Sequence, residues 1–233
     1  MNLAPAVLIV DDEAAIRRLL RTSLQAEGYR TEEAATGAEA LVRAQDADII
    51  VLDLGLPDID GLEVIRRLRA GSTVPIIVLS SREAEGGKVA ALDLGADDYV
   101  TKPFGIAELM ARLRAALRHR LQAENTPPVF RSGNLSVDLV RRIVKLGAAD
   151  VHLSPREYDI LTLLVAHAGK VLTHRMVLGK LWGASGDVQQ LRVYIRQLRQ
   201  KIEADSERPR HLLTETGVGY RLRIANIPER PGV

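Results

Sequence analysis

The chain has 233 residues, a length that predicts two domains of roughly 100–130 residues each. Hydrophobic residues make up 46% of the chain but aromatic residues only 3%, so we expect cores built from leucine, valine, isoleucine and alanine. The absence of cysteine excludes disulfides and thiolate metal sites. The sequence contains neither a signal-peptide pattern nor an apolar run of about 18 residues, so we expect a cytoplasmic protein without a membrane span.

The small net charge of +2 conceals an acidic half and a basic half. Residues 1–121 carry 15 basic and 19 acidic side chains, whereas residues 122–233 carry 17 basic and 11 acidic ones. The net charges are therefore −4 and +6. A basic half favours contact with a polyanion such as nucleic acid, but ordinary variation of surface charge explains the same numbers equally well.

Short apolar runs alternate with amphipathic segments through the first half of the chain. Strands are predicted at 7–10, 29–33, 49–52, 75–79 and 99–101. Helices are predicted at 14–27, 62–69 and 106–121, and a further helical stretch is predicted to end at 94. Strands that alternate with helices form parallel sheets covered on both faces, so residues 1–121 are predicted to be an α/β domain. A polar segment at 122–128, which ends in two prolines, is the predicted linker.

The pattern changes in the predicted second domain, residues 129–227. Short β-prone pieces at 129–151 predict a small antiparallel sheet, and Ser154-Pro155-Arg156-Glu157 opens a helix with a capping box. Further elements are predicted as helices at 173–181 and 187–203 and a β-hairpin at 212–224. These elements predict a smaller α+β domain, followed by a tail at 228–233.

Chemically active residues follow several of the predicted strands in the first half. They are the pair Asp11-Asp12, then Asp53, Ser80 and Lys102. Because the carboxyl ends of parallel strands share one edge of the sheet, we expect these side chains to meet there. Three carboxylates in one place require a cation, and ligands that are all oxygen favour Mg²⁺.

Such a cluster has the composition of a phosphoryl-acceptor site. Asp53 is the candidate nucleophile toward phosphorus, Lys102 and the metal would balance charge on the phosphoryl oxygens, and Ser80 would donate a hydrogen bond to them. A Mg²⁺-dependent aspartyl-nucleophile phosphatase uses similar groups and is the alternative. That enzyme class places a second carboxylate two residues after the nucleophile, where this chain has Gly55, so a stoichiometric acceptor that is not an enzyme is favoured.

In their order, these motifs resemble the receiver domain of two-component response regulators. The matching residues are Asp11-Asp12, Asp53 with Pro57 and Gly61, Ser80, and Tyr99 with Lys102-Pro103. Over residues 1–121 the resemblance implies a flavodoxin-like (βα)5 fold and phosphorylation of Asp53 by a sensor histidine kinase. It also implies a Mg²⁺ site made by Asp11, Asp12, Asp53 and the backbone carbonyl of Gly55. Ser80 and Tyr99 would form a switch pair, and the Lys102-Pro103 peptide bond would be cis.

An apolar stripe and a basic stripe run side by side along the predicted helix at 187–203. The apolar stripe consists of Val188, Leu191, Ile195, Leu198 and Ile202. The basic stripe consists of Arg192, Arg196 and Arg199, with Gln189 one turn earlier. Such a helix suits a DNA groove, because arginine binds phosphate or guanine and glutamine pairs with adenine. A solvated basic face is the alternative.

Residues 129–227 resemble the winged-helix effector domain of the OmpR/PhoB subfamily. The resemblance implies promoter-DNA contacts from Arg192, Tyr194, Arg196, Arg199, Thr214 and Thr216. It also implies that Trp182 and the loop at 183–187 touch the DNA backbone or RNA polymerase. The phrases at 53–61, 192–203 and 208–221 are most similar to regulators of potassium transport, which implies control of potassium-uptake genes. A DNA-independent signalling adaptor is the alternative.

Phosphorylation of Asp53 would add one to two negative charges at the edge of the sheet, draw in Ser80 and let Tyr99 turn inward. The family then dimerises through its fourth helix, fifth strand and fifth helix. The residues predicted to meet across the two-fold axis are Lys88 with Glu108 and Asp98 with Arg112, around Val89, Leu92 and Met110. Charge pairing within one chain is the alternative. A two-fold dimer would present two recognition helices to repeated half-sites.

Overall fold

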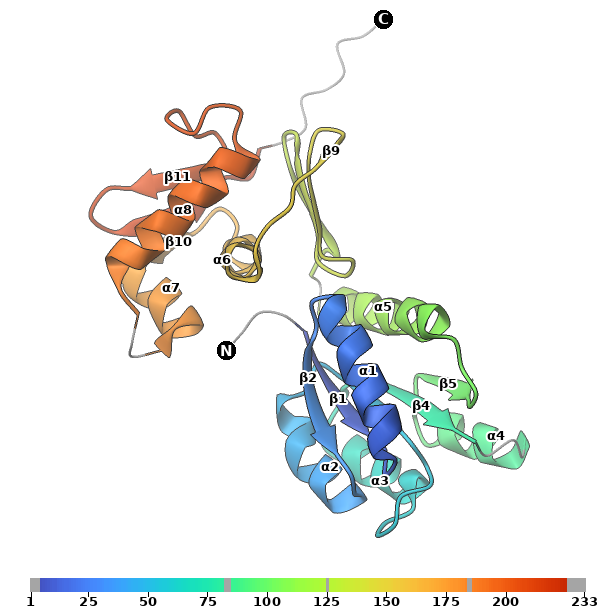
Figure 1. The fold of residues 1–233 in the computed structure, drawn as a ribbon. Coiled ribbons are helices and arrows are strands. Elements are labelled where there is room, and N and C mark those ends of the chain that lie inside the picture. Colours follow the sequence, from blue (N-terminus) through green and yellow to red (C-terminus); the bar gives the residue numbers. More distant parts are fainter. Residues whose placement is uncertain (1–4, 82–84, 125, 184–185, 226–233) are drawn as a thin grey trace, which may run out of the picture. The chain divides into compact units, whose positions relative to one another are not determined.

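The computed structural model describes residues 5–81, 85–124, 126–183 and 186–225, and the chain forms two compact units (Figure 1). Of the described residues, the first unit comprises 5–124 and the second comprises 126–225. The predicted tail at 228–233 and the last two residues of the predicted second domain lie outside the described residues.

A parallel sheet of five strands forms the centre of the first unit, in the order β2-β1-β3-β4-β5. The strands are β1 (Ala6–Val10), β2 (Arg30–Ala34), β3 (Ile49–Leu52), β4 (Ile76–Ser80) and β5 (Asp98–Thr101). β1, β3 and β4 are buried along their whole length, which is why they appear in the sequence as nearly uninterrupted apolar runs. Their carboxyl ends lie at one edge of the sheet, where the predicted site residues follow.

Helices cover both faces of this sheet (Figure 1). On one face pack α1 (Ala14–Ala26) and α5 (Ile106–Ala123), and on the other α2 (Gly37–Arg43), α3 (Gly61–Arg69) and α4 (Glu85–Asp93). Alternate strand residues therefore enter two separate cores, so that Leu8 packs on the α2–α3 side and Ile9 on the α1–α5 side. The predicted α/β fold class is confirmed, although α5 runs two residues into the segment predicted as linker.

Helix α2 and the 3₁₀ turn η1 (Ala44–Asp46) are elements that the sequence did not predict. Thr36 caps α2 through the N–H of Glu39. Asp58 accepts the N–H of Gly37 at 2.7 Å and the N–H of Ala38 at 2.9 Å. Since Asp58 belongs to the loop after β3, the start of α2 depends on a tertiary contact that a local pattern does not contain.

In the part of the second unit that the structure describes, there are two small antiparallel sheets and three α-helices (Figure 1). The first sheet consists of β6 (Val129–Ser132), β7 (Leu135–Asp138), β8 (Ile143–Leu146) and β9 (Ala149–Asp150). The second has the order β10-β12-β11, with β10 (Val171–Thr173), β11 (Leu212–Glu215) and β12 (Gly219–Leu222). The sequence predicted the β11–β12 hairpin but missed β10, which has only three residues.

Helices α6 (Pro155–Ala166), α7 (His174–Leu181) and α8 (Val188–Ile202) pack around a common core with these sheets. The predicted apolar stripe of α8 faces inward, and Leu191, Ile195, Leu198 and Ile202 are all buried. The opposite side of α8 is thereby left at the surface. The α+β class predicted for this half is confirmed.

The predicted capping box at the start of α6 is present and is joined to the end of α8. Ser154 accepts the N–H of Glu157, and the Glu157 carboxylate accepts the N–H of Ser154 at 2.7 Å. Lys201 donates to the same carboxylate at 2.7 Å. Burial alone would raise the pKa of Glu157, but the hydrogen bonds from Lys201 and Ser154 lower it below its ordinary value.

We expect Glu157→Gln to lower the free energy of unfolding of the second unit by about 1–2 kcal/mol at pH 7, because it weakens a cap and an ion pair. A depressed carboxyl pKa stabilises the fold above the unfolded value and loses this effect as pH falls below about 4. The variant should therefore lose less stability on acidification than the wild type, as measured by urea unfolding at pH 7 and pH 3.5. Asp150→Asn, which removes the exposed ion pair with Lys145, is the matched control. Parallel pH profiles for wild type and Glu157→Gln would contradict the assignment.

Candidate functional site

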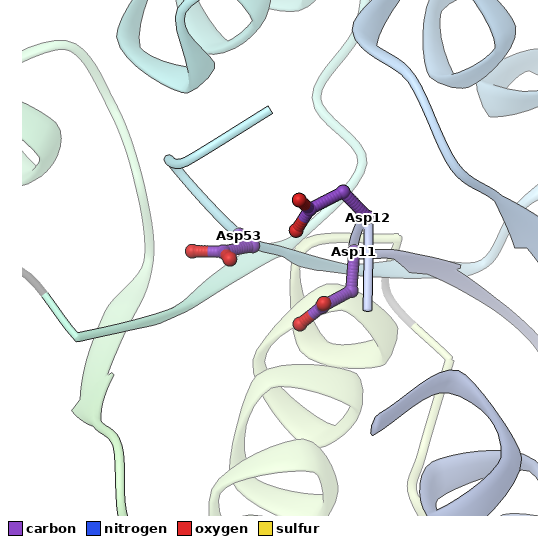
Figure 2. Close-up of side chains that lie close together, drawn as sticks. All are labelled: Asp11, Asp12 and Asp53. Carbon is purple, nitrogen blue, oxygen red and sulfur yellow. The ribbon is translucent and has the colours of Figure 1, made fainter. Parts of the chain in front are cut away.

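Three carboxylates gather at the carboxyl edge of the parallel sheet. Figure 2 shows Asp11 and Asp12 at the end of β1 and Asp53 after β3, with their carboxylates around a common space. One oxygen from each lies within 4.8 Å of the others. Asp11 is 1% exposed and Asp53 is 6% exposed, whereas Asp12 faces solvent. The site is thus closed at its base and open on one side.

Lys102 provides a cation at this site. Its Nζ donates to Oδ2 of Asp11 at 2.7 Å and to Oδ2 of Asp53 at 3.0 Å. The Lys102-Pro103 peptide bond is cis, as the family resemblance implied. Glu13, which sequence reasoning missed, also approaches the ammonium at 3.4 Å. The only sequence signal for Glu13 is its position directly after the acidic pair.

The electrostatics of the cluster favour a further positive charge. Burial raises the pKa of Asp11, the neighbouring Asp53 charge acts in the same direction, and the Lys102 ammonium offsets part of the effect. Burial by itself would lower the pKa of Lys102, but its bonds to Asp11 and Asp53 and their charges raise it, so it stays an ammonium. Asp11 and Asp53 share the Lys102 ammonium, and the oxygens of the three carboxylates form a donor set that suits a hard divalent cation.

The three other predicted site residues Ser80, Tyr99 and Gly55 are found in different settings. Ser80 ends β4 and is buried, and the Gly55 N–H approaches Oδ1 of Asp53 at 3.3 Å. Tyr99 is already buried in the core beneath α3 and α4. The inward turn predicted for Tyr99 is therefore not needed to bury its ring in this conformation.

Helix α8 presents polar side chains on the face opposite its buried stripe. Gln189, Arg192 and Arg196 are exposed there. Tyr194 is half-buried and packs against Trp182 at the end of α7, with 5.9 Å between ring centroids. In the β11–β12 hairpin, Thr214 and Thr216 are exposed.

Arg199 differs from the other two arginines of the predicted basic stripe. It is half-buried, its Nε and Nη2 donate to the carbonyl of Leu212 at 3.0 and 2.7 Å, and Nη2 also donates to Oγ1 of Thr214 at 2.7 Å. Burial lowers the pKa of Arg199. The helical spacing alone does not distinguish Arg199 from Arg192 and Arg196, because only the return of the chain as β11 covers the last turns of the helix.

Two family models match the chain. One is the response regulator receiver domain, over residues 7–114, and the other is the C-terminal domain of transcriptional regulatory proteins, over residues 148–222. The KDP operon transcriptional regulatory protein KdpE of Escherichia coli K12 is 51% identical over 222 residues, which are 94% of this chain and 99% of that protein. The chain is a KdpE-like response regulator of the OmpR/PhoB type. Its first unit is a receiver domain and its second unit is a winged-helix DNA-binding domain.

Further similarities of this response regulator extend over nearly its whole length. The transcriptional regulatory protein KdpE of Mycobacterium tuberculosis H37Rv is 47% identical over 220 residues, covering 92% of this chain and 97% of that protein. The solved structure of response regulator DrrB, an OmpR/PhoB homologue from Thermotoga maritima, is 30% identical with a TM-score of 0.45, covering 94% of this chain and 99% of that one.

The predicted dimer surface of the response regulator is only partly available. Val89 and Leu92 of α4 are exposed apolar side chains, as predicted. Met110 was wrongly placed there, because it is 4% exposed and packs in the α1–α5 core. Arg112 pairs within the chain, with Asp98 at 2.8 Å and with Glu108 at 2.7 Å. These ion pairs match the alternative in which the charges pair within one chain.

Arg156 is a second residue that sequence reasoning missed in this regulator. Its guanidinium lies 5.0 Å from the centre of the Trp182 ring, and its Nη1 donates to the Leu181 carbonyl at 2.8 Å. It thus supports Trp182 from the start of α6. Of the predicted contact loop at 183–187, residues 184–185 lie outside the described residues.

In the ranges that the structure covers, no helix has the length and apolar composition that a membrane crossing requires.

Proposed function

We propose that this response regulator accepts a phosphoryl group from a sensor histidine kinase on Asp53 and then binds promoter DNA as a dimer. The observation that carries the proposal is the convergence of Asp53, Asp11 and Lys102, with Lys102 within 3.0 Å of both carboxylates. This arrangement places a nucleophilic carboxylate beside a fixed ammonium. The similarity to KdpE proteins over both domains supports the connection to transcription.

The residues of the acidic cluster fit a divalent metal ion. Asp11, Asp12, Asp53 and the backbone carbonyl of Gly55 would hold Mg²⁺. When bound, the metal neutralises charge on the phosphoryl oxygens and on the cluster itself. Burial, and to a smaller extent the Asp53 charge, raises the pKa of Asp11, and a cation bound beside it would favour its carboxylate form.

The chain's own residues account for the transfer. A carboxylate oxygen of Asp53 forms the new bond to phosphorus while the bond from phosphorus to the leaving atom of the donor breaks. Lys102 holds Asp53 by a hydrogen bond and faces the charge that develops on the phosphoryl oxygens. Ser80, at the end of β4, then donates its hydroxyl to the bound phosphoryl group, and Tyr99 of β5 responds to its movement.

We assign DNA recognition to the exposed face of α8 and to the wing, which is the β11–β12 hairpin. The contact residues would be Gln189, Arg192, Tyr194, Arg196, Thr214 and Thr216. Trp182 and the loop at 183–187 would touch the DNA backbone or RNA polymerase. The relatives' names refer to the KDP operon and to KdpE, so genes of potassium uptake are the proposed target.

Dimerisation would use α4, β5 and α5. Val89 and Leu92 form its exposed apolar centre. Lys88 lies beside them and would pair with Glu108 of the second copy. For Asp98 and Arg112 to pair across the two-fold axis, their intramolecular bonds must be exchanged, which costs little at partly exposed sites.

The proposal is tested by incubating the full chain with Mg²⁺ and acetyl phosphate. We expect one phosphoryl group per chain by intact-protein mass spectrometry, a shift from monomer to dimer, and at least about tenfold tighter binding to DNA selected from a random-sequence pool. Chelation of Mg²⁺ is the control and should prevent all three changes. Equal DNA affinity with and without full phosphorylation would contradict the switch. Continuous release of phosphate without a stable adduct would favour the phosphatase alternative.

A further inference from the structure

Among the described residues, strand β11 is one of the two edge strands of the β10-β12-β11 sheet, and side chains at the end of α8 bond to it. In the order β10-β12-β11, β11 pairs with β12 on one side only. An edge strand leaves every second N–H and C=O without a partner in the sheet. In this domain, the side chains of Arg199 and of the α8 C-cap residue Glu203 satisfy those groups at Leu212.

Both backbone groups of Leu212 are bonded to side chains at the end of α8, one from the helix and one from its C-cap residue. The Leu212 carbonyl accepts from Arg199 at 2.7 and 3.0 Å, and the Leu212 N–H donates to Oε1 of Glu203 at 2.7 Å. Glu203 also accepts the N–H of His211 at 2.9 Å and the N–H of Arg210 at 2.8 Å. Arg199 lies in the last turns of α8 and Glu203 is its C-cap residue, so both side chains reach Leu212 from the end of the helix.

These contacts bind the recognition helix to the base of the wing. Glu203 and Leu212 are buried, so the bonds form where water competes weakly. Nη2 of Arg199 also donates to Oγ1 of Thr214, a predicted DNA-contact residue of the wing. The wing clamp, defined as Arg199, Glu203 and Leu212, thus fixes the position of β11 relative to the exposed arginines of α8.

We propose that Arg199 is a positioning residue for DNA binding, which acts by fixing the wing against the recognition helix and not by contacting DNA. This inference rests on the proposed DNA recognition by α8 and the wing, and it replaces the predicted DNA contact of Arg199. Two structural elements that must reach the same duplex bind more tightly when their relative position is set in advance. Loosening the clamp should cost affinity without removing a contact to phosphate.

The test compares variants of the full phosphorylated chain on a duplex selected by the wild type from a random-sequence pool. Arg199→Lys keeps the positive charge but loses the forked guanidinium that reaches Leu212 and Thr214 together. We expect it to weaken binding about tenfold, with an unchanged slope of log affinity against log salt concentration. Arg131→Gln, which alters an exposed arginine of β6, is the control for loss of a charge elsewhere in the domain.

Glu203→Gln provides a second test, because simple electrostatics and the wing clamp predict opposite changes in DNA affinity. Removing a negative charge from a DNA-binding domain should tighten binding to a polyanion. The wing clamp predicts weaker binding instead. The NH2 group of glutamine is a donor, so it cannot accept the Arg210 N–H as the Glu203 carboxylate oxygen does. In Arg199→Lys and Glu203→Gln, hydrogen exchange at the β11 amides should be faster than in the wild type. The midpoint of thermal unfolding of both variants should stay above the temperature of the binding assay.

The outcomes separate this inference from the proposed function. The positioning role would be overturned if Arg199→Lys bound DNA with wild-type affinity. It would also be overturned if the salt slope fell by about 0.9 in Arg199→Gln, because that change indicates a direct phosphate contact. Tighter binding by Glu203→Gln would also overturn it. If the wild type binds no duplex, or if Arg196→Gln leaves binding unchanged, DNA recognition by α8 fails instead.

Discussion

Asp53→Asn is expected to accept no phosphoryl group from acetyl phosphate in Mg²⁺, whereas the wild type accepts one per chain. The amide keeps the size of the side chain and an oxygen for the Lys102 ammonium, but it cannot attack phosphorus as a carboxylate does. It also removes one of the three negative charges that would bind the metal. Intact-protein mass spectrometry should show the loss as a missing adduct, and DNA affinity should no longer respond to the donor.

Asp12→Asn is the matched control for this prediction. It removes a carboxylate of the same cluster, but the side chain is exposed, and the Lys102 bonds to Asp11 and Asp53 stay in place. We expect slower phosphorylation and a higher Mg²⁺ requirement, with the adduct still formed at saturating metal. In the wild type the adduct should be labile to hydroxylamine, as an acyl phosphate is. A stable adduct on Asp53→Asn would place the acceptor elsewhere in the chain.

The acidic cluster could be predicted from the sequence because its geometry follows from topology. Asp11, Asp53 and Lys102 are far apart in the chain, but each follows a strand of one parallel sheet. Once the strands were identified by their buried apolar runs, the shared edge was determined. Glu13 could not be assigned in this way, because its approach to Lys102 depends on side-chain direction at the start of α1.

Elements and contacts that depend on distant parts of the chain were harder to predict. Helix α2 has a short apolar pattern and takes part of its cap from Asp58. Met110 follows the helical spacing of Leu113 and Leu117, which places it in the core, whereas the family resemblance implied a position on the dimer surface of α5. Arg199 has the same spacing as Arg196, and only the return of β11 distinguishes them.

Gly219→Ala is expected to disrupt the winged-helix domain while leaving the receiver domain intact. A Cβ at Gly219 would lie 1.9 Å from the Leu172 carbonyl oxygen and 2.8 Å from the Thr173 Cα. Both are backbone atoms of β10, which pairs with β12 at this point, so no side-chain rotation relieves the clash. Separation of the two strands would break the sheet that carries the wing. We expect a loss of at least about 3 kcal/mol in the stability of this domain.

The effect of Gly219→Ala should be local in a protein with two compact units. Thermal unfolding should show an early transition for the winged-helix domain, and DNA binding should be lost, while Asp53 still accepts a phosphoryl group. Gly179→Ala is the matched control, since a Cβ on this exposed position of α7 meets no atom within 4 Å. That variant should be unchanged or more stable by about 0.5–1 kcal/mol, because alanine favours the helix. Wild-type stability of Gly219→Ala would mean that β10 does not pair with β12 at this point.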